Sequence, residues 1–502
     1  MELERITPEQ AGISGEKVKD CIQKLMHDET QMHGFMAARD GKVFAEGWWT
    51  PYGPERIHCN HSLGKSYTAA AIGILYTQRK LKLEERVVDL FADELRQYGI
   101  EPDENMKKLT VYHVLTMTNG MARHPIMDAE WLKNYLAEPV VAEPGTEFLY
   151  NSSGSCLLGA IVKKKTGKGM REFLKEFLFD KIGIDGERFQ IFRFPDGYDA
   201  EPGTASVTED NLRLAILFMN YGNWNGEQII AEDWMHMAMS CQISTEPNGG
   251  TEDYRHGYGF QLWNSAIPGV YRFDGGQGQY GLIWPERKIA VAIHEGAVMP
   301  EGPQITLDVL YEYLLNEMRN EPLPEDPQAD AALLEFERNL KVPEQEANTL
   351  YVPTECFSGS YAVVSGDGDP WISVAPGGYN FFTCFYHDDK KQAFTDFTLK
   401  TDEQKCVFTV DGYAVFEAYF DGKHHPVYTD NVLPEIGWNC SYARYLDEDT
   451  LQITTKWLNG WFDDRIVMKK KGDILEMTFY KDRLTVSDNR YTIKHCTAKR
   501  QQ

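Results

Sequence analysis

The segment Ser62-Leu63-Gly64-Lys65 leads directly into Ser66-Tyr67-Thr68-Ala69-Ala70-Ala71-Ile72-Gly73-Ile74-Leu75, a run of small and apolar residues that favours a helix. If the helix begins near Ser62, the i, i+3 spacing places the serine hydroxyl and the Lys65 amine on one face, close enough for proton transfer. The positive end of a helix also stabilises developing negative charge and disfavours a nearby ammonium. The segment therefore predicts a serine nucleophile with a lysine base.

A Ser-x-x-Lys string is a weak signal on its own, because a chain of this length contains roughly one or two by chance. A second copy, Ser14-Gly15-Glu16-Lys17, is better explained by Ser14 as the N-cap of an exposed first helix. The same explanation competes at the first copy, where Ser62 would cap the helix and Lys65 would be solvated. The segment alone leaves both interpretations open.

A second polar segment, Glu147-Phe148-Leu149-Tyr150-Asn151-Ser152-Ser153-Gly154, follows the turn Glu143-Pro144-Gly145-Thr146. A Pro-Gly turn, an apolar step and then small hydroxyl and amide residues are typical of a polar loop held between hydrophobic supports, and such loops often line sites. The alternative is a structural Tyr150 whose ring packs while its hydroxyl meets solvent. Tyr150 is therefore a candidate site residue.

A glycine-rich segment, Arg272-Phe273-Asp274-Gly275-Gly276-Gln277-Gly278-Gln279-Tyr280-Gly281, precedes the apolar run Leu282-Ile283-Trp284. The turn Pro285-Glu286-Arg287 and the run Ile289-Ala290-Val291-Ala292-Ile293 follow, which predicts a β-hairpin. Glycines in a strand often mark the close approach of a ligand or of another backbone, and a β-bulge is the alternative.

Other signals for catalytic or metal-binding sites are weak. His294-Glu295 lacks a second histidine four residues after the first, and His424-His425 has no partner at metal-ligand spacing, so we expect surface histidines. Neither a G-x-S-x-G elbow nor a phosphate-binding G-x-x-x-x-G-K-[ST] loop occurs. We expect neither a metal nor a cofactor.

The composition argues against several classes of protein. Of 502 residues, 42% are hydrophobic and 25% are charged, as in soluble proteins with a sizeable core. The 51 Lys and Arg residues against 76 Asp and Glu residues give a net charge of −25, which opposes binding to nucleic acids or anionic lipids. The nine cysteines include no C-x-x-C pair, and no run of about 18 apolar residues occurs. The start of the chain also lacks the apolar run of a signal peptide, so we expect a cytoplasmic protein that contacts neither nucleic acid nor membrane.

The chain divides into three parts by pattern. Residues 1–320 alternate helical and strand patterns, with amphipathic helices expected at Ser66–Lys82 and Gly159–Leu178, and predict one α+β domain. Residues 321–350 are rich in Pro, Glu, Asp and Ala and are the predicted linker. Residues 351–502 consist of short alternating segments separated by Asp-Gly and Gly-Asp turns, which predicts an antiparallel barrel or sandwich.

The three segments, taken in order, resemble the serine β-lactamase and penicillin-binding-protein superfamily, especially its class C-like esterase, amidase and D-aminopeptidase branch. The resemblance implies an antiparallel sheet flanked by helices, plus a helical region, and the part after Tyr351 resembles the lipocalin-like barrels appended to some members. It implies that Ser62 is acylated, that Lys65 is its base and that Tyr150 relays the proton to the leaving group. The backbone amides of Ser62 and Gly276 would form the oxyanion hole.

The chain departs from the superfamily at two motifs. Tyr-x-Asn is replaced by a sequence in which Asn151 directly follows Tyr150 and Ser152 takes the third place, so either residue would orient the substrate amide. Asp274 and Gly275, expected to line the substrate site, stand where Lys-Thr-Gly or His-x-Gly is common. This removes a cation for a substrate carboxylate and argues against antibiotic hydrolysis and cell-wall work. Asp274 would instead attract an amine, or it would face solvent.

The leading expectation is a metal-independent serine hydrolase that cleaves small esters, amides or short peptides through an acyl-enzyme on Ser62. One alternative is a non-catalytic binding or sensor protein on the same fold, which the altered third motif favours. Another is a penicillin-recognising enzyme, either a β-lactamase or a DD-peptidase. No pattern in the sequence predicts an oligomeric state.

Overall fold

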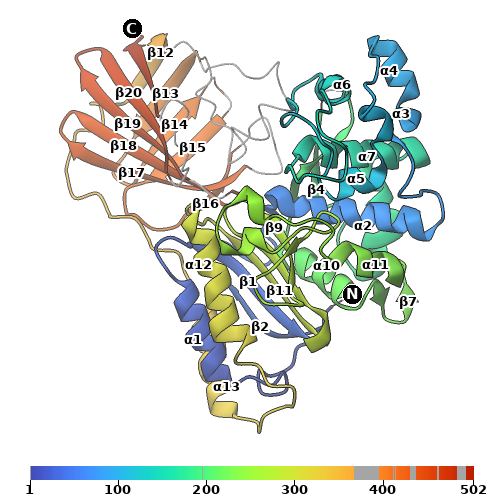
Figure 1. Cartoon of the computed structure of the whole chain (residues 1–502). Helices are drawn as coiled ribbons and strands as arrows, with labels where there is room; N and C mark the ends of the chain where they lie inside the picture. The colour runs from blue at the N-terminus through green and yellow to red at the C-terminus, as the bar shows by residue number, and fades with distance from the viewer. Residues whose placement is uncertain are drawn as a thin grey trace.

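The computed structural model of the chain describes residues 2–194, 196–366, 395–410, 412, 414–429, 437–460, 463–482 and 493–501. Figure 1 shows two bodies. The chain up to Arg338 builds helices around a sheet, which we call the α+β unit, and the strands from Gly359 onward build a second body, which we call the barrel.

The sheet of the α+β unit has six antiparallel strands among the described residues. In spatial order they are β2 (Lys42–Trp48), β1 (Met32–Arg39), β11 (Ile289–Glu295), β10 (Gln279–Trp284), β9 (Tyr271–Gly275) and β8 (Trp263–Asn264). The predicted hairpin is confirmed, since Trp284 of β10 pairs with Ile289 of β11 across the turn at Pro285. The glycine-rich segment forms a second hairpin, in which Gly275 of β9 pairs with Gln279 of β10.

The sheet separates two hydrophobic cores, because successive side chains of a strand point to opposite faces. Along β1, Phe35 and Ala37 lie in one core, and Met36 and Ala38 lie in the other. The first core is covered by α1 (Gly15–Leu25), α12 (Glu301–Leu310) and α13 (Pro327–Arg338), and the second by α10 (Thr208–Met219). Burial of both faces explains the unbroken apolar run in β11.

Further helices form the helical region that the resemblance implies (Figure 1). They are α2 (Gly64–Thr77), α3 (Val87–Leu90), α4 (Ala92–Tyr98), α5 (Val111–Leu115), α6 (Trp131–Ala137), α7 (Ser152–Thr166), α8 (Met170–Leu174), α9 (Asp180–Ile182) and α11 (Glu232–Met239). A short hairpin of β6 (Asn223–Trp224) and β7 (Glu227–Gln228) precedes α11.

Two expected helices differ from the structure. The amphipathic helix expected at Ser66–Lys82 is instead the buried α2, in which every residue from Gly64 to Leu75 is buried. Gly73 shows how closely it is packed, because a Cβ there would lie 2.8 Å from the Ile230 side chain. The stretch Gly159–Leu178 is divided, because Gly167 adopts a φ of +75° and ends α7 before α8 begins.

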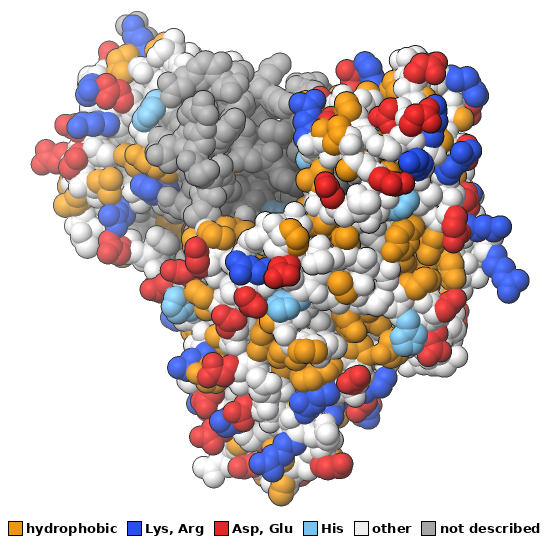
Figure 2. All heavy atoms as spheres, in the orientation of Figure 1, with side chains coloured by type: hydrophobic (Ala, Val, Ile, Leu, Met, Phe, Trp, Pro, Cys, Tyr) orange, Lys and Arg blue, Asp and Glu red, His pale blue; other side chains and the backbone are white. Residues whose placement is uncertain are grey.

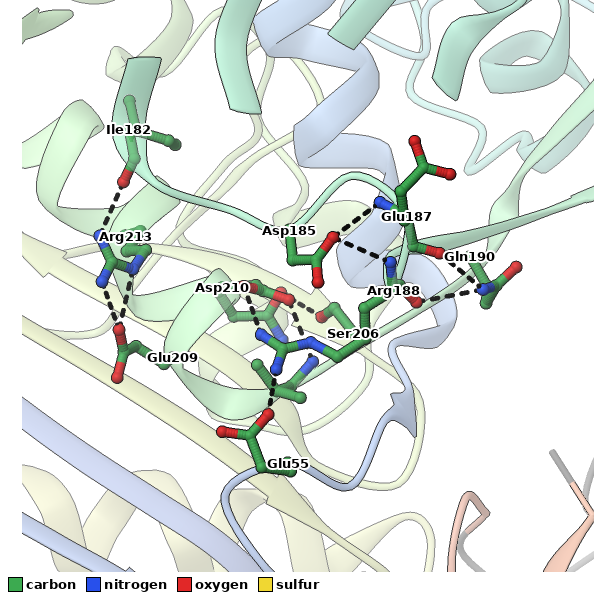
Figure 3. Close-up of polar contacts among 12 residues, drawn as sticks. Glu55, Ile182, Asp185, Glu187, Arg188, Gln190, Ser206, Glu209, Asp210 and Arg213 are labelled. Atoms are coloured by element: carbon green, nitrogen blue, oxygen red, sulfur yellow. Dashed lines mark hydrogen bonds and ion pairs between the residues drawn. The ribbon is translucent and has the colours of Figure 1, made fainter. Parts of the chain in front are cut away.

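A small sheet carries the chain into the predicted nucleophile segment. In it, β5 (Asp199–Ser206) lies between β3 (His58–Cys59) and β4 (Gln190–Arg193). Figure 3 shows Arg188 between Glu55 and Asp210, pairing with both carboxylates. Because Asp210 lies in the first turn of α10, these ion pairs connect the segment before β3 to a helix of the sheet's second face.

The second body is a closed barrel rather than a sandwich. Its strands are β12 (Gly359–Gly366), β13 (Asp396–Thr401), β14 (Lys405–Val410), β15 (Ala414–Tyr419), β16 (Pro426–Tyr428), β17 (Trp438–Asp447), β18 (Thr450–Trp457), β19 (Asp463–Lys471), β20 (Ile474–Asp482) and β21 (Ile493–Arg500). Among the described residues, nine strands close the ring and β16 pairs only with β17. The pairs within the ring are antiparallel except β15 with β17, which closes it in parallel.

The segment expected as a linker contains α13, which packs on α1 through the buried Leu333. No helix among the described residues has the length and apolar character needed to span a bilayer. Figure 2 shows acidic and basic side chains interspersed over the visible face of the α+β unit, so the net charge of −25 does not form one patch there.

Candidate active site

Ser62 and Lys65 lie together at the start of α2. Ser62 is the middle residue of a short 3-10 turn, His61–Leu63, and is partly exposed, whereas Lys65 in the first turn of α2 is 1% exposed. The Lys65 Nζ lies 2.7 Å from the Ser62 Oγ. The hydroxyl therefore has a potential base within hydrogen-bond distance while it stays accessible from outside.

Tyr150 is brought to the same place from the end of the loop before α7. Its ring centroid lies 4.8 Å from the Lys65 Nζ. Burial raises the pKa of the Tyr150 phenol, and a hydrogen bond with the Ser62 side chain acts in the opposite direction. The structure thus assembles the three predicted side chains from two distant segments.

The glycine-rich segment approaches the nucleophile from β9. A Cβ on Gly275 would lie 2.1 Å from the Asn60 carbonyl oxygen and 3.1 Å from the Leu63 nitrogen. Only glycine therefore allows β9 to come this close to the nucleophile turn. Gly276 follows at the strand end and is partly exposed, and a Cβ there would lie 4.0 Å from the His61 ring.

Asp274 lies in the interior, so the solvent-facing alternative is wrong. It is 8% exposed, pairs with the fully buried Arg272 at 2.8 Å and accepts a hydrogen bond from the Tyr254 hydroxyl at 3.0 Å. Arg272 also lies 3.5 Å from the buried Asp253. An approaching amine would compete with these partners for Asp274, and its role toward substrate stays a prediction.

Asn151 and Ser152 hold the start of α7. The Asn151 Oδ1 accepts hydrogen bonds from the Gly154 nitrogen at 3.0 Å and the Ser153 hydroxyl at 2.7 Å, so Asn151 is the N-cap. The Ser152 nitrogen donates to the Nε2 of His124 at 2.9 Å. These contacts fix the start of α7, directly after Tyr150. The substrate-orienting role of Asn151 or Ser152 stays a prediction.

His124 was not identified by the sequence analysis as a site residue. Although the residue as a whole is exposed, the surroundings of its ring lower the pKa of His124, first by partial desolvation and further by the charge of Lys65. Its Nδ1 lies 2.8 Å from the Pro125 carbonyl, so the ring is held at both nitrogens, with Nε2 as the acceptor. No sequence motif marks it, because its position depends on the loop that packs against α7.

The expectation that His294 lies on the surface is wrong. It is 2% exposed because β11 is a central strand of the sheet, and its Nε2 lies 3.0 Å from the Asn60 Oδ1. The Asn60 Nδ2 donates to Thr204 Oγ1 at 3.1 Å and Ser206 Oγ at 2.9 Å. Asn60 therefore fixes the residues just before the nucleophile to both sheets.

Aromatic side chains form a wall beside Tyr150. Its ring lies 5.9 Å from that of Trp263, which in turn lies 4.9 Å from the ring of Tyr258. Phe148 contacts both of these rings. The wall gives the site an apolar side.

One group of potential metal ligands occurs in the described part of the chain. The single group of His, Cys, Asp or Glu side chains close enough to share an ion there is Glu9, Glu325 and Asp330, which belongs to the N-terminal segment and the start of α13. None of the candidate site residues is part of it.

Known proteins resemble this chain in sequence and in fold. The family model described as "Beta-lactamase" matches residues 18–295, which is more than half of the chain and includes all the candidate site residues. The chain belongs to the beta-lactamase family. Penicillin-binding protein 4 of Amycolatopsis lactamdurans is 30% identical over 272 residues, covering 46% of this chain and 70% of the relative.

Solved structures of low identity share the beta-lactamase fold. The "Putative 6-aminohexanoate-dimer hydrolase" from Bacillus anthracis has a TM-score of 0.52 and 18% identity, covering 65% of this chain and 89% of its own. A penicillin-binding protein homologue from Caulobacter crescentus has a TM-score of 0.50 and 15% identity, covering 62% of this chain and 100% of its own. At such identities the likeness concerns the fold of the beta-lactamase family domain.

Proposed function

We propose that this member of the beta-lactamase family is a metal-independent serine hydrolase that cleaves small esters or amides through an acyl-enzyme on Ser62. The observation that carries the proposal is the 2.7 Å contact between the Ser62 Oγ and the Nζ of the buried Lys65, beside Tyr150. A weak nucleophile with an adjacent base is the arrangement that covalent acyl transfer requires.

The proposed reaction begins when Lys65 takes the Ser62 proton and the Ser62 oxygen attacks the substrate carbonyl. The developing oxyanion accepts hydrogen bonds from the backbone amides of Ser62 and Gly276, and each such donor lowers the barrier by on the order of 3 kcal/mol. Tyr150 then gives its proton to the leaving group. A raised pKa suits this step because it keeps the phenol protonated at neutral pH.

The leaving group departs with the Tyr150 proton, and the acyl group stays on the Ser62 oxygen as an ester. Water then attacks that ester and gives its proton to the Tyr150 phenolate, while the Lys65 ammonium returns a proton to the Ser62 oxygen as the acyl group leaves as an acid. Ser62, Lys65 and Tyr150 are thereby restored to their starting protonation states. The aromatic wall beside Tyr150 favours an apolar acyl or leaving group.

The charge around the site favours neutral substrates. Arg272 is shared inside the protein by the Asp274 and Asp253 carboxylates, so this cation is not available to a substrate. A substrate carboxylate would meet no spare cation from β9. We therefore expect uncharged esters and amides to react faster than their carboxylate-bearing analogues.

Intact-mass measurement after exposure to a fluorophosphonate tests the proposal. We expect one adduct on the wild type, none on Ser62→Ala, and turnover of acyl p-nitrophenyl esters or aminoacyl amides by the wild type. Absence of an adduct and of turnover would favour the alternative of a binding or sensor protein.

The similarity to Penicillin-binding protein 4 motivates a second candidate, recognition of penicillins. Rapid labelling of Ser62 by a fluorescent penicillin would support it. The internal pairing of Arg272 argues against it, because this cation is not available to a β-lactam carboxylate.

A further inference from the structure

We propose that the barrel positions the nucleophile, through the turn that follows β18 and above all through Asn459. The inference rests on the proposed role of Ser62. It makes the barrel part of the catalytic unit rather than an appended domain, although about 400 residues of chain separate Asn459 from Ser62.

Asn459 forms two hydrogen bonds with the strand that leads to the nucleophile. Its backbone carbonyl accepts a hydrogen bond from the Cys59 nitrogen at 2.9 Å, and its Nδ2 donates to the Ile57 carbonyl at 2.6 Å. These two bonds lie on either side of His58. Asn459 is 3% exposed, so water does not readily replace them.

The turn completes the small sheet. One edge of β3 pairs with β5, and the Asn459 turn occupies the other edge. His58 reinforces the junction, since its Nδ1 lies 3.0 Å from the Cys59 carbonyl oxygen and its Nε2 lies 2.9 Å from the His33 Nδ1. The strand is thus held from the barrel, from β5 and from β1.

The position of the strand determines the position of Ser62, because the chain between them has little freedom. Asn60 is bound through its side chain to Thr204 and Ser206, and His61 adopts a φ of +49°. Gly275 of β9 packs closely against the Asn60 carbonyl and so limits movement of this backbone toward β9. A shift of Cys59 is therefore passed on to Ser62, and a misplacement of about 1 Å costs on the order of 100-fold in rate.

Other contacts attach the barrel without touching β3. The Tyr52 hydroxyl donates to the Trp457 carbonyl at 3.5 Å, Lys456 donates to Gln31 at 3.4 Å, and Arg56 lies over the Trp438 ring at 4.1 Å. Loss of the Asn459 side chain should therefore leave the barrel docked. The Asn459 Oδ1 is buried without a partner among the described residues, which further limits the cost of Asn459→Ala.

The test compares Asn459→Ala with Asn439→Ala in the full chain. Asn439 is fully buried, and its side-chain hydrogen-bond partners within the described part of the chain all belong to the barrel: the Val427 and Gly437 carbonyls and the Thr429 and Ser441 hydroxyls. Four quantities are measured: the melting temperature, the kcat and the KM for p-nitrophenyl acetate, and the hydrogen exchange of the peptide covering residues 57–63.

For Asn459→Ala we expect kcat to fall by about tenfold or more with little change in KM, and exchange at residues 57–63 to accelerate. Asn439→Ala should lower the melting temperature but leave kcat and this exchange unchanged. Wild-type kcat and exchange in Asn459→Ala would overturn the inference, as would equal losses of kcat in both variants.

The exchange measurement separates this inference from the proposed function. If the wild type forms no fluorophosphonate adduct, the proposed function fails. Exchange at residues 57–63 still shows whether Asn459 holds the strand, and unchanged exchange in Asn459→Ala would overturn the positioning role independently of any activity.

Discussion

Gly275→Ala tests whether contact between β9 and the nucleophile turn sets the geometry of the site. The backbone of Gly275 does not adopt the positive φ that favours glycine, so the effect of the substitution is steric. The added Cβ would lie 2.1 Å from the Asn60 carbonyl oxygen, and that carbonyl belongs to backbone that precedes Ser62 by two residues.

The magnitude follows from the distance. Restoring an ordinary contact of 3.4 Å from 2.1 Å requires roughly 1.3 Å of movement between β9 and the nucleophile turn. Such a movement separates Ser62 from the Gly276 amide and should lower kcat/KM by on the order of 100-fold, or about 2.7 kcal/mol of barrier. Overpacking should lower the free energy of unfolding by about 1–3 kcal/mol.

The assay is kcat/KM with p-nitrophenyl acetate, read beside urea unfolding. Gly53→Ala is the matched control, because nothing lies within 4 Å of a Cβ at that position. We expect the control to keep both activity and stability. Wild-type kcat/KM in Gly275→Ala would refute the reasoning, because it would show that the site tolerates movement of β9.

Three further predictions concern single side chains. Tyr150→Phe keeps the ring beside Lys65 but removes the proton, so hydrolysis of amides should fall by about 10²–10⁴-fold and that of p-nitrophenyl esters by less, since p-nitrophenolate leaves unprotonated. Asp210→Asn should reduce the pH dependence of stability. Burial raises the pKa of Asp210 to about 7, so the folded chain holds a proton that the unfolded chain loses as the pH rises from about 4 to about 7, and stability falls through that window. Urea unfolding should show this loss, roughly 3 kcal/mol between pH 5 and pH 8, to be absent from the variant. Arg272→Met leaves Asp274 and Asp253 buried without their cation and should lower the free energy of unfolding by about 3–5 kcal/mol.

Distinct results would contradict each of these. Equal losses on amides and p-nitrophenyl esters would exclude Tyr150 as the proton donor to the leaving group. Parallel stability curves of wild type and Asp210→Asn would show that this carboxyl does not titrate in the window. Unchanged unfolding of Arg272→Met would show that the buried ion pair contributes no net stability.

Local patterns in the sequence were sufficient for much of the site. Ser62 and Lys65 are one helical turn apart, so the local backbone alone brings their side chains together. No contact with a distant segment is needed for this. The hairpin of β10 and β11 follows from turn residues between apolar runs. The alternating segments after Tyr351 likewise predicted strands, which the structure closes into a barrel.

Burial was predicted less well, because it depends on which elements surround a residue. The residues of α2 suggested a helix with one exposed face, yet its neighbours cover it on all sides. A surface position was expected for His294 because no second histidine follows at metal-ligand spacing, but the central place of β11 in the sheet makes it a buried partner of Asn60.

The chain order of Ser62, Lys65, Tyr150 and the glycine-rich strand was enough to indicate a family and a candidate reaction. Three contacts were decided by the tertiary structure alone. Arg272 pairs with Asp274, Gly275 packs against the Asn60 carbonyl, and Asn459 of the barrel hydrogen-bonds to the strand before Ser62. A motif records residues that are near in sequence, whereas these contacts join side chains and backbone from separate elements, so only the packed chain specifies them.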